Sequence, residues 1–311
     1  MLSYALFEGR PVTTKGRWIN PLIFTLFALK KRLPPLKKVE QPIFIVGTGR
    51  SGTTILGIVL SLHQDVGFLN EPKALWHAIY PHEDLIGSYS CEAAHYRLSA
   101  KDVTDEVTQS AHRLFGAYLT AVASKRVVDK YPELIFRTSF VRTIFPDAKF
   151  IFLVRNGWDT CQSITGWSKR FGVQDKDEVH DWWGVNYRKW HLLVNQLVAT
   201  NPNFKSITEE VRSLNRQTDM AAVEWIVTMK EGLRLMQESD SIYKLHYEEL
   251  TSHPDKSLTQ LLEFCELPTD KAVFDYAHQI LAPAPPHKSF DLHPAIRPLF
   301  EDTMTALGYE I

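Results

Sequence analysis

The sequence has few cysteines and almost no net charge. Among its 311 residues are three cysteines, Cys91, Cys161 and Cys265, which lie far apart and outside any paired spacing typical of a metal site. We therefore expect free thiols and a reducing compartment. The formal net charge of −1 argues against a general attraction to nucleic acid, so any anionic ligand has to be bound by local groups.

The first forty residues lack the features of a membrane span or of a secretory signal. Their apolar part, from Trp18 to Leu29, is too short to cross a bilayer and is interrupted by Asn20-Pro21. No small-residue cleavage site follows it. We predict that residues 1–40 form a basic and apolar N-terminal arm packed across the domain. The alternative is a peripheral contact of residues 15–38 with a membrane surface, because lysines and arginines flank the apolar part.

The rest of the chain, residues 41–311, has neither an internal repeat nor a low-complexity linker. Strand-like apolar runs alternate there with helical ones, which is typical of a single α/β domain. We predict a mostly parallel central sheet flanked by helices. The expected strands are the start of 43–56, 66–69, 126–130, 149–154 and 242–246, and the expected helices include 103–122, 132–145, 160–164, 179–199, 216–238, 256–265 and 295–307.

Glycine and polar residues mark the carboxyl ends of the predicted strands. Gly47, Glu71, Lys130, Arg155 and Tyr247 each fall at or just past a strand end. In a parallel sheet these ends share one edge, where ligands bind. We therefore expect one cleft to bring the five residues together.

The most informative stretch, residues 43–56, predicts a strand, a tight turn and the start of a helix. Gly47 and Gly52 occupy the positions of the two glycines of a phosphate-binding loop, but Thr53 stands where that loop has its lysine. Unpaired N–H groups at the helix start still favour an anion. Further donors come from Arg50, Ser51, Thr53 and Thr54. Together with the predicted sheet, this loop indicates a three-layer P-loop-like fold.

The missing lysine limits the group-transfer reactions that this loop can support. That lysine is the point charge that reaches the β- and γ-phosphates, so its absence argues against Mg-dependent phosphoryl transfer. A sulfuryl group carries less negative charge than a terminal phosphoryl group, and a metal-free cradle of amides, hydroxyls and one arginine suffices to hold it. The alternative is a nucleotide or small-molecule kinase with a variant loop.

Two motifs resemble those of a known family. Arg50-Ser51-Gly52-Thr53-Thr54 resembles the 5′-phosphosulfate loop of sulfotransferases that use 3′-phosphoadenosine 5′-phosphosulfate (PAPS), in particular the tyrosylprotein sulfotransferases. Arg155 and Ser163 offer a guanidinium fork and a hydroxyl that can converge on one phosphate, and they are similar to the family's 3′-phosphate site. Asn156 stands where an aspartate is common. The resemblance implies that these residues bind PAPS, and its product 3′-phosphoadenosine 5′-phosphate (PAP), without a metal.

The same resemblance implies that Glu71, Lys130 and Arg50 are catalytic. Glu71 lies 21 residues after Arg50, where tyrosylprotein enzymes have the glutamate that takes the acceptor proton. Lys130 ends a strand whose lysine stabilises the departing nucleotide phosphate, although Asp129 replaces an asparagine of that group. Tyr247 is implied as a nucleotide contact. From the residues alone, Glu71 can equally be a helix N-terminal glutamate and Lys130 a solvated lysine.

Several other conspicuous side chains are expected to be structural. We predict core or cleft-wall positions for the aromatic residues Trp182, Trp183, Tyr187 and Trp190. Helix, core or loop positions are expected for His63, His77 and His82, because nothing pairs them with a nucleophile or a metal. Lys288 is either a surface lysine or part of a C-terminal loop that closes over the nucleotide.

The motifs together predict a PAPS-dependent sulfotransferase that moves a sulfuryl group to an acceptor hydroxyl by in-line displacement. The acceptor stays open among small molecules, carbohydrates, lipids and peptide tyrosines, because Glu71-Pro72 with Trp76-His77 is also similar to carbohydrate sulfotransferases. The oligomeric state stays open as well. Besides the kinase, a nucleotide-binding module without catalytic activity is an alternative.

The location is predicted from a missing motif. Eukaryotic relatives in this family often work in the Golgi behind a membrane anchor, whereas PAPS is generally a cytosolic metabolite in bacteria. The chain has no Asn-X-Ser/Thr glycosylation acceptor. We therefore predict a cytoplasmic location, with membrane association through residues 15–38 as a further option.

Overall fold

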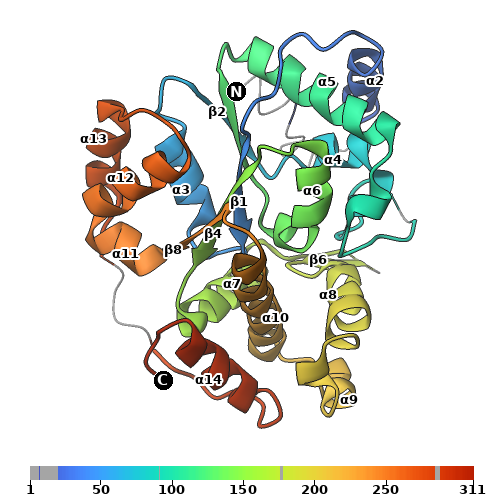
Figure 1. The fold of residues 1–311 in the computed structure, drawn as a ribbon. Coiled ribbons are helices and arrows are strands. Elements are labelled where there is room, and N and C mark those ends of the chain that lie inside the picture. Colours follow the sequence, from blue (N-terminus) through green and yellow to red (C-terminus); the bar gives the residue numbers. More distant parts are fainter. Residues whose placement is uncertain (1–6, 8–19, 91, 176–177, 284–287) are drawn as a thin grey trace.

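The fold is built on a central sheet of five parallel strands, described by a computed structural model that covers residues 7, 20–90, 92–175, 178–283 and 288–311 (Figure 1). The strand order is β2-β3-β1-β4-β8. The strands are β1 Ile43–Gly47, β2 Val66–Asn70, β3 Arg126–Lys130, β4 Lys149–Val154 and β8 Ile242–His246. This arrangement confirms the predicted parallel sheet, and each strand lies within a residue or so of the expected range.

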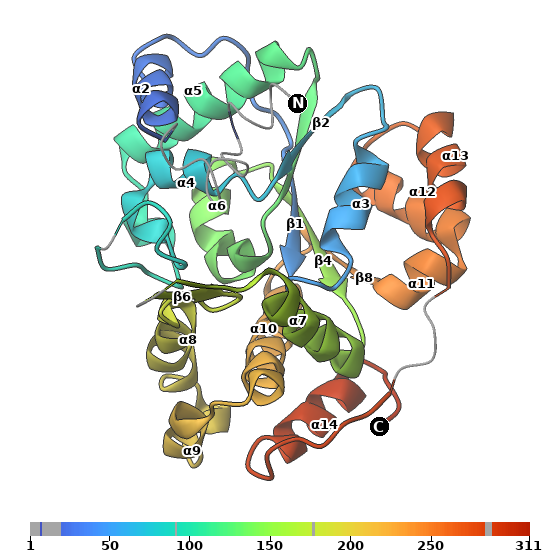
Figure 2. The same cartoon turned by 180° about the vertical axis from the view of Figure 1, so that it is seen from behind.

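Side chains of the central strand β1 alternate between two buried layers. Phe44 and Val46 belong to the larger core, while Ile43 and Ile45 belong to the smaller one, and all four are fully buried. A strand covered on both faces reads as a continuous apolar run, which is why this stretch was recognisable. The three-layer architecture follows from these two cores (Figure 2).

Helices cover both faces of the sheet and the edge formed by its carboxyl ends. One face carries α3, α11, α12 and α13, the other carries α4, α5 and α6, and α7 and α10 lie below the strand ends (Figure 1). The helices are α2 Asn20–Lys30, α3 Thr53–Leu60, α4 Lys73–Ile79, α5 Asp105–Ala121, α6 Thr138–Ile144, α7 Gly157–Phe171, α8 Arg188–Leu193, α9 Thr208–Ser213, α10 Gln217–Glu238, α11 Tyr247–Ser252, α12 Pro254–Phe264, α13 Lys271–Ile280 and α14 Arg297–Ala306. Short 3-10 turns cover Pro81–Glu83, Ala100–Asp102, Pro132–Arg137 and Pro202–Phe204, and a π-helical turn covers Val194–Val198.

The predicted helix over residues 179–199 is wrong in its first half. A separate three-stranded antiparallel sheet forms there from β5 Val173–Asp175, β6 Glu178–Asp181 and β7 Gly184–Val185. The helix begins only at Arg188, because Asn186 and Tyr187 adopt the left-handed conformation with φ of 48° and 60°. Apolar residues spaced for a helix are therefore divided between a sheet and α8.

Of the predicted N-terminal arm, residue 7 and residues 20–40 are described. Ile23 and Phe27 of α2 are buried against the larger core, where α2 packs on α4 and α5. Asn20-Pro21 begins this helix and does not interrupt one, as expected for proline in a first turn. Leu22, with a relative exposure of 61%, faces outward. The membrane contact of residues 15–38 and the boundary of the arm at residue 40 stay predictions.

Candidate active site

The turn between β1 and α3 has a backbone that requires glycine at two positions. Gly47 has φ of 138°, and a Cβ atom there would lie 2.6 Å from the carbonyl oxygen of Leu153. Gly52 has φ of 92°, and a Cβ atom there would lie 2.3 Å from the ring of Tyr247. The chain therefore turns sharply between sheet and helix, and the first N–H groups of α3 open at the carboxyl edge of the sheet.

We expect Gly52→Ala to destabilise the protein by about 1–2 kcal/mol, because an L-residue is strained in this left-handed conformation. The affinity for PAP should fall as well, because the new methyl group displaces the ring of Tyr247. The matched control is Gly166→Ala in α7, where nothing lies within 4 Å of the added Cβ. That variant should gain roughly 0.5–1 kcal/mol from better helix propensity. Urea unfolding and calorimetric titration measure both effects, and equal behaviour of the two variants would contradict the prediction.

Buried polar groups at the turn lack protein partners. The hydroxyls of Thr48 and Ser51 and the Nε of Arg155 are buried without a hydrogen-bond partner among the described residues. Buried donors without partners are rare in folded proteins, so they point to a ligand that accepts hydrogen bonds. A bound anion fits this donor set.

Arg50 links the turn to the predicted 3′-phosphate residues. Its Nε donates to Ser163 Oγ at 3.2 Å, and its carbonyl oxygen accepts from Arg155 Nη1 at 3.1 Å. The Arg155 guanidinium also lies 4.8 Å from the ring centroid of Tyr247 and 3.8 Å from Asp159. Arg50, Arg155, Ser163 and Tyr247 therefore gather on one side of the turn.

Two neighbouring elements hold this side in place. Glu248 accepts a hydrogen bond from Asn156 N at 2.9 Å and another from the Tyr309 hydroxyl at 2.8 Å, so it orients the turn after β4. Gln162, beside Ser163, donates to the carbonyl oxygen of Lys288 at 2.7 Å. The backbone at Lys288 thus lies next to α7.

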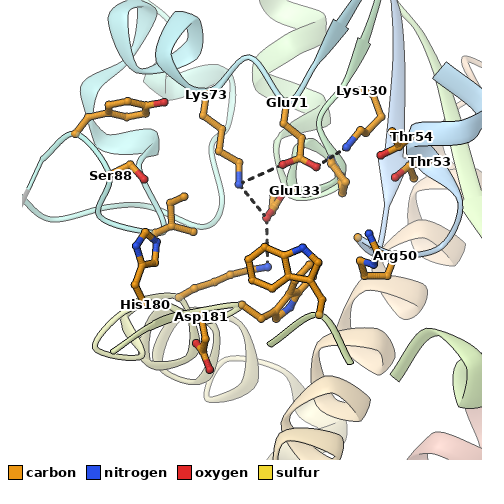
Figure 3. A pocket seen from close by; sticks show the side chains of 17 residues that line it. Arg50, Thr53, Thr54, Glu71, Lys73, Ser88, Lys130, Glu133, His180 and Asp181 are labelled. Carbon is orange, nitrogen blue, oxygen red and sulfur yellow. Dashed lines mark hydrogen bonds and ion pairs between the residues drawn. The ribbon is translucent and has the colours of Figure 1, made fainter. Parts of the chain in front are cut away.

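The turn also borders a cavity of about 300 Å³ (Figure 3). The loop residues Arg50, Thr53 and Thr54 line it together with Glu71 and Lys130. β2 and β3 run in parallel with Asn70 opposite Lys130, so Glu71 and Lys130 emerge at the same edge, and the Lys130 ammonium pairs with the Glu71 carboxylate. The structure therefore joins the three predicted catalytic residues. Arg155, Ser163 and Tyr247 lie across the turn and do not line this cavity.

The charged residues that were not recognised from the sequence include Lys73, Glu133 and Lys189, which line this cavity, and Glu224, which pairs with Lys189. Lys73 Nζ lies 3.7 Å from Glu71 Oε2 and 4.0 Å from Glu133 Oε1. Lys189 Nζ lies 3.3 Å from Glu133 Oε1 and 2.6 Å from Glu224 Oε1. The carboxylates and ammonium groups alternate in sign from Glu71 to Glu224.

Burial and charge oppose each other in this chain of residues. Burial alone would raise the pKa of the Glu133 carboxyl, but Lys73 and Lys189 hold it below its usual value. Burial alone would lower the pKa of Lys189, but Glu224 and Glu133 raise it, so the ammonium stays charged. The Glu133 carboxylate and the Lys189 ammonium therefore both stay ionised near neutral pH.

The tryptophans of the aromatic cluster Trp182, Trp183 and Trp190 lie partly in the core and partly in the cavity wall. Trp183 and Trp190 are buried in the larger core, whereas Trp182 lines the cavity and donates to Glu224 Oε2 at 2.6 Å. The indole lies against the turn, because a Cβ atom at Gly49 would be 2.4 Å from it. Trp182 reaches this position because it directly follows β6 of the small antiparallel sheet and is not part of a helix.

The three histidines named above occupy structural positions outside the cavity lining. The ring nitrogens of His63 and His82 are bonded to the carbonyl oxygens of Pro268 and Ala93, and His77 stacks on Tyr89. His180 does line the cavity. Within the described ranges, no group of three or more His, Cys, Asp or Glu side chains is arranged to hold a metal ion.

Comparisons with known proteins agree on one family. A family profile described as "Sulfotransferase family" matches residues 42–205, just over half of the 311 residues. The chain is 26% identical over 248 residues to the protein-tyrosine sulfotransferase of Drosophila melanogaster, covering 78% of this chain and 42% of that protein. It is 26% identical over 273 residues to protein-tyrosine sulfotransferase 1 of Danio rerio, covering 84% of this chain and 64% of that protein. The chain thus spans less than two thirds of the length of these relatives.

Solved structures support the fold. The sulfotransferase domain from the curacin biosynthetic pathway matches with a TM-score of 0.51 at 16% identity, over 88% of this chain and all of that one. The sulfotransferase domain of the Synechococcus PCC 7002 olefin synthase matches with a TM-score of 0.51 at 18% identity, over 89% of this chain and 98% of that one. At these identities the likeness shows the shared fold.

The predicted cytoplasmic location is wrong. Two relatives that cover 78% and 84% of this chain are animal protein-tyrosine sulfotransferases, the eukaryotic group for which the resemblance implies the Golgi. Cys161 and Cys265 are free and buried, and Cys91 lies outside the described residues. Among the described residues, no helix is both long and apolar enough to cross a bilayer.

Proposed function

We propose, because this chain belongs to the sulfotransferase family, that it moves a sulfuryl group from PAPS to the hydroxyl of an acceptor. The observation that supports this proposal most is the set of buried donors without partners around the turn, at Thr48, Ser51 and Arg155. These donors suit a ligand with two separate anionic groups, one on each side of Arg50. No lysine of the P-loop type is present for a triphosphate.

The proposal divides the donor's two anionic groups between the two sides of the turn. Residues 50–54 hold the 5′-phosphosulfate with backbone N–H groups and hydroxyls at the start of α3. Arg155 and Ser163 hold the 3′-phosphate beside the ring of Tyr247. When bound, PAPS supplies an activated sulfuryl group.

Glu71 and Lys130 carry the chemical step in this proposal. Glu71 takes the proton of the acceptor hydroxyl as the acceptor oxygen bonds to sulfur and the bond from sulfur to the phosphate oxygen breaks on the opposite side. Lys130 neutralises the charge that grows on the departing phosphate oxygen. Without substrate, the Lys130 ammonium pairs with the Glu71 carboxylate, so the two groups lie side by side before the donor binds.

Nucleotide binding tests the proposal first. We expect PAP to bind at least about tenfold more tightly than ATP with Mg²⁺, because charge-assisted hydrogen bonds to a 3′-phosphate are worth roughly 1.5–3 kcal/mol. Isothermal titration calorimetry measures both affinities. Equal affinities would contradict the proposal and favour the alternative, a nucleotide or small-molecule kinase with a variant loop.

Sulfuryl transfer tests it second. Labelled PAPS incubated with phenols, sugars, lipids and tyrosine peptides should yield a labelled product with one of these classes. The names of the relatives favour peptide tyrosine as the first acceptor to try. Tight PAP binding without transfer to any acceptor class would instead indicate a nucleotide-binding module without catalytic activity.

A further inference from the structure

Glu71 faces two cations, and only one of them has a role in the proposed chemistry. Lys130, at the end of β3, pairs with Glu71 Oε1, while Lys73 Nζ lies 3.7 Å from Glu71 Oε2 (Figure 3). Lys130 has a relative exposure of 1%, and Lys73 is mostly buried. Two ammonium groups therefore approach one carboxylate from different elements.

Lys73 is tied to Glu71 by the backbone as well. Glu71 adopts the left-handed conformation with φ of 55°, and its carbonyl oxygen accepts from Lys73 N at 2.7 Å. Glu71 N in turn donates to the Lys130 carbonyl oxygen at 2.7 Å. Pro72 stiffens the turn between the two side chains. The separation of Lys73 from Glu71 is thus fixed by a short and well-bonded turn.

A second carboxylate holds the Lys73 ammonium between two negative charges. Glu133 Oε1 lies 4.0 Å from Lys73 Nζ, and Glu133 is itself held by Lys189, which is held by Glu224 of α10. Glu71 and Glu133 repel each other, since each disfavours ionisation of the other. Lys73 lies where it compensates that repulsion.

We propose that Lys73 is a positioning residue that keeps Glu71 ionised and in place when Lys130 turns to the leaving group, an inference that rests on the proposed function. During transfer Lys130 is needed at the departing phosphate oxygen, so Glu71 loses its nearest cation. Lys73 stays, because Glu133 and the turn at Pro72 fix it. The proton of the acceptor hydroxyl then moves to a carboxylate that is still accompanied by the Lys73 ammonium.

The charged and titratable groups around Glu71 come from several elements. They line the same cavity and are Arg50 of the turn after β1, Lys73 of α4, Tyr89 of the following loop, Lys130 of β3, Glu133 of the 3-10 turn, Lys189 of α8, and His180 and Asp181 of β6. Of these, Lys130 and Lys73 have ion pairs with Glu71 at 4 Å or less. Removal of Lys73 therefore takes away one of the two cations that pair with Glu71, while the Glu133 carboxylate stays in place beside Lys189.

Lys73→Met tests the inference through the pH dependence of turnover. With both substrates saturating, the acidic limb of the kcat profile should move up by about one pH unit or more. The reason is that an opposite charge within about 4–6 Å lowers the pKa of a carboxyl group by about 1–3, and this substitution removes such a charge. The acidic limb of the pH profile of kcat/KM for PAPS should move less, because Lys130 still accompanies Glu71 before the donor binds. Lys73→Arg should restore the wild-type limb, and the Kd for PAP should stay unchanged.

Glu133→Gln is expected to move the acidic limb of the kcat profile in the opposite direction. It removes the carboxylate that repels Glu71 and leaves Lys73 with Glu71 alone, so the acidic limb of kcat should move to lower pH. Lys169→Met, an exposed lysine of α7, serves as the control for loss of one positive charge. Circular dichroism and thermal unfolding verify that each variant is folded.

The outcomes separate this inference from the proposed function. If the wild-type protein transfers no label from PAPS, the proposed function fails. If it does transfer label, and the acidic limbs of Lys73→Met and Glu133→Gln coincide with that of wild type, Lys73 is a structural residue and the inference is overturned. A lower kcat in Lys73→Met without a displaced limb, or one that arginine does not restore, overturns it equally.

Discussion

Replacing Glu71 by glutamine is expected to lower kcat by about 10²–10⁴-fold, the usual contribution of a general base. The amide keeps the shape of the side chain but cannot take the acceptor proton. Affinity for PAP should stay nearly unchanged, because the residues proposed for nucleotide binding lie in the turn and beyond it. Single-turnover transfer from labelled PAPS, together with titration of PAP, measures both quantities.

Glu249→Gln is the matched control for this substitution. Glu249 is an exposed glutamate of α11, close in sequence to Tyr247, and its replacement should leave kcat intact. Loss of PAP binding in Glu71→Gln would reassign Glu71 to a structural role, because its carboxylate also holds Lys130 and Lys73. A kcat near the wild-type value would remove it from catalysis altogether.

Replacing Arg155 by alanine should weaken PAP binding by roughly 10- to 100-fold, since a charge-assisted hydrogen bond is worth about 1.5–3 kcal/mol. The affinity for adenosine 5′-monophosphate, which has no 3′-phosphate, should change little. Arg155→Lys should recover part of the loss, because lysine keeps the charge but not the fork. Calorimetric titration of both nucleotides into each variant gives the selectivity directly.

The two nucleotides distinguish a direct from an indirect effect of Arg155. Its guanidinium also donates to the carbonyl oxygen of Arg50, so its removal can disturb the turn. An equal loss for both nucleotides would show that Arg155 acts through the turn and not on a 3′-phosphate. Arg170→Ala, at the exposed end of α7, controls for the loss of positive charge.

The sheet and the edge that carries the site were predictable because they depend on local patterns. β1 and β4 are covered on both faces and appear in the sequence as unbroken apolar runs, and the polar residues that follow them mark the strand ends. Gly47 and Gly52 were recognisable because their backbone conformation admits little else. Glu71 and Lys130 then meet because parallel strands end together.

The charged chain behind Glu71 was not predictable for a physical reason. Lys189 and Glu224 lie on α8 and α10, far apart in the sequence, and each looks like an ordinary polar position of a helix. Their burial, with relative exposures of 3% and 4%, arises only when the helices pack. Lys73 and Glu133 did give a signal, since each follows a predicted catalytic residue by two or three positions, and spacing alone could have nominated them.

The contact between Gly49 and the Trp182 indole links the turn after β1 to the wall of the cavity. Any side chain at Gly49 would occupy the place of the indole, and a displaced indole would lose its hydrogen bond to Glu224, the carboxylate that anchors Lys189. Under the proposed function, changes in the turn that binds the nucleotide should therefore also change the cavity wall at Trp182. Sequence variation at position 49 should be accompanied by variation at position 182, and any redesign of this part of the cavity wall has to include the turn.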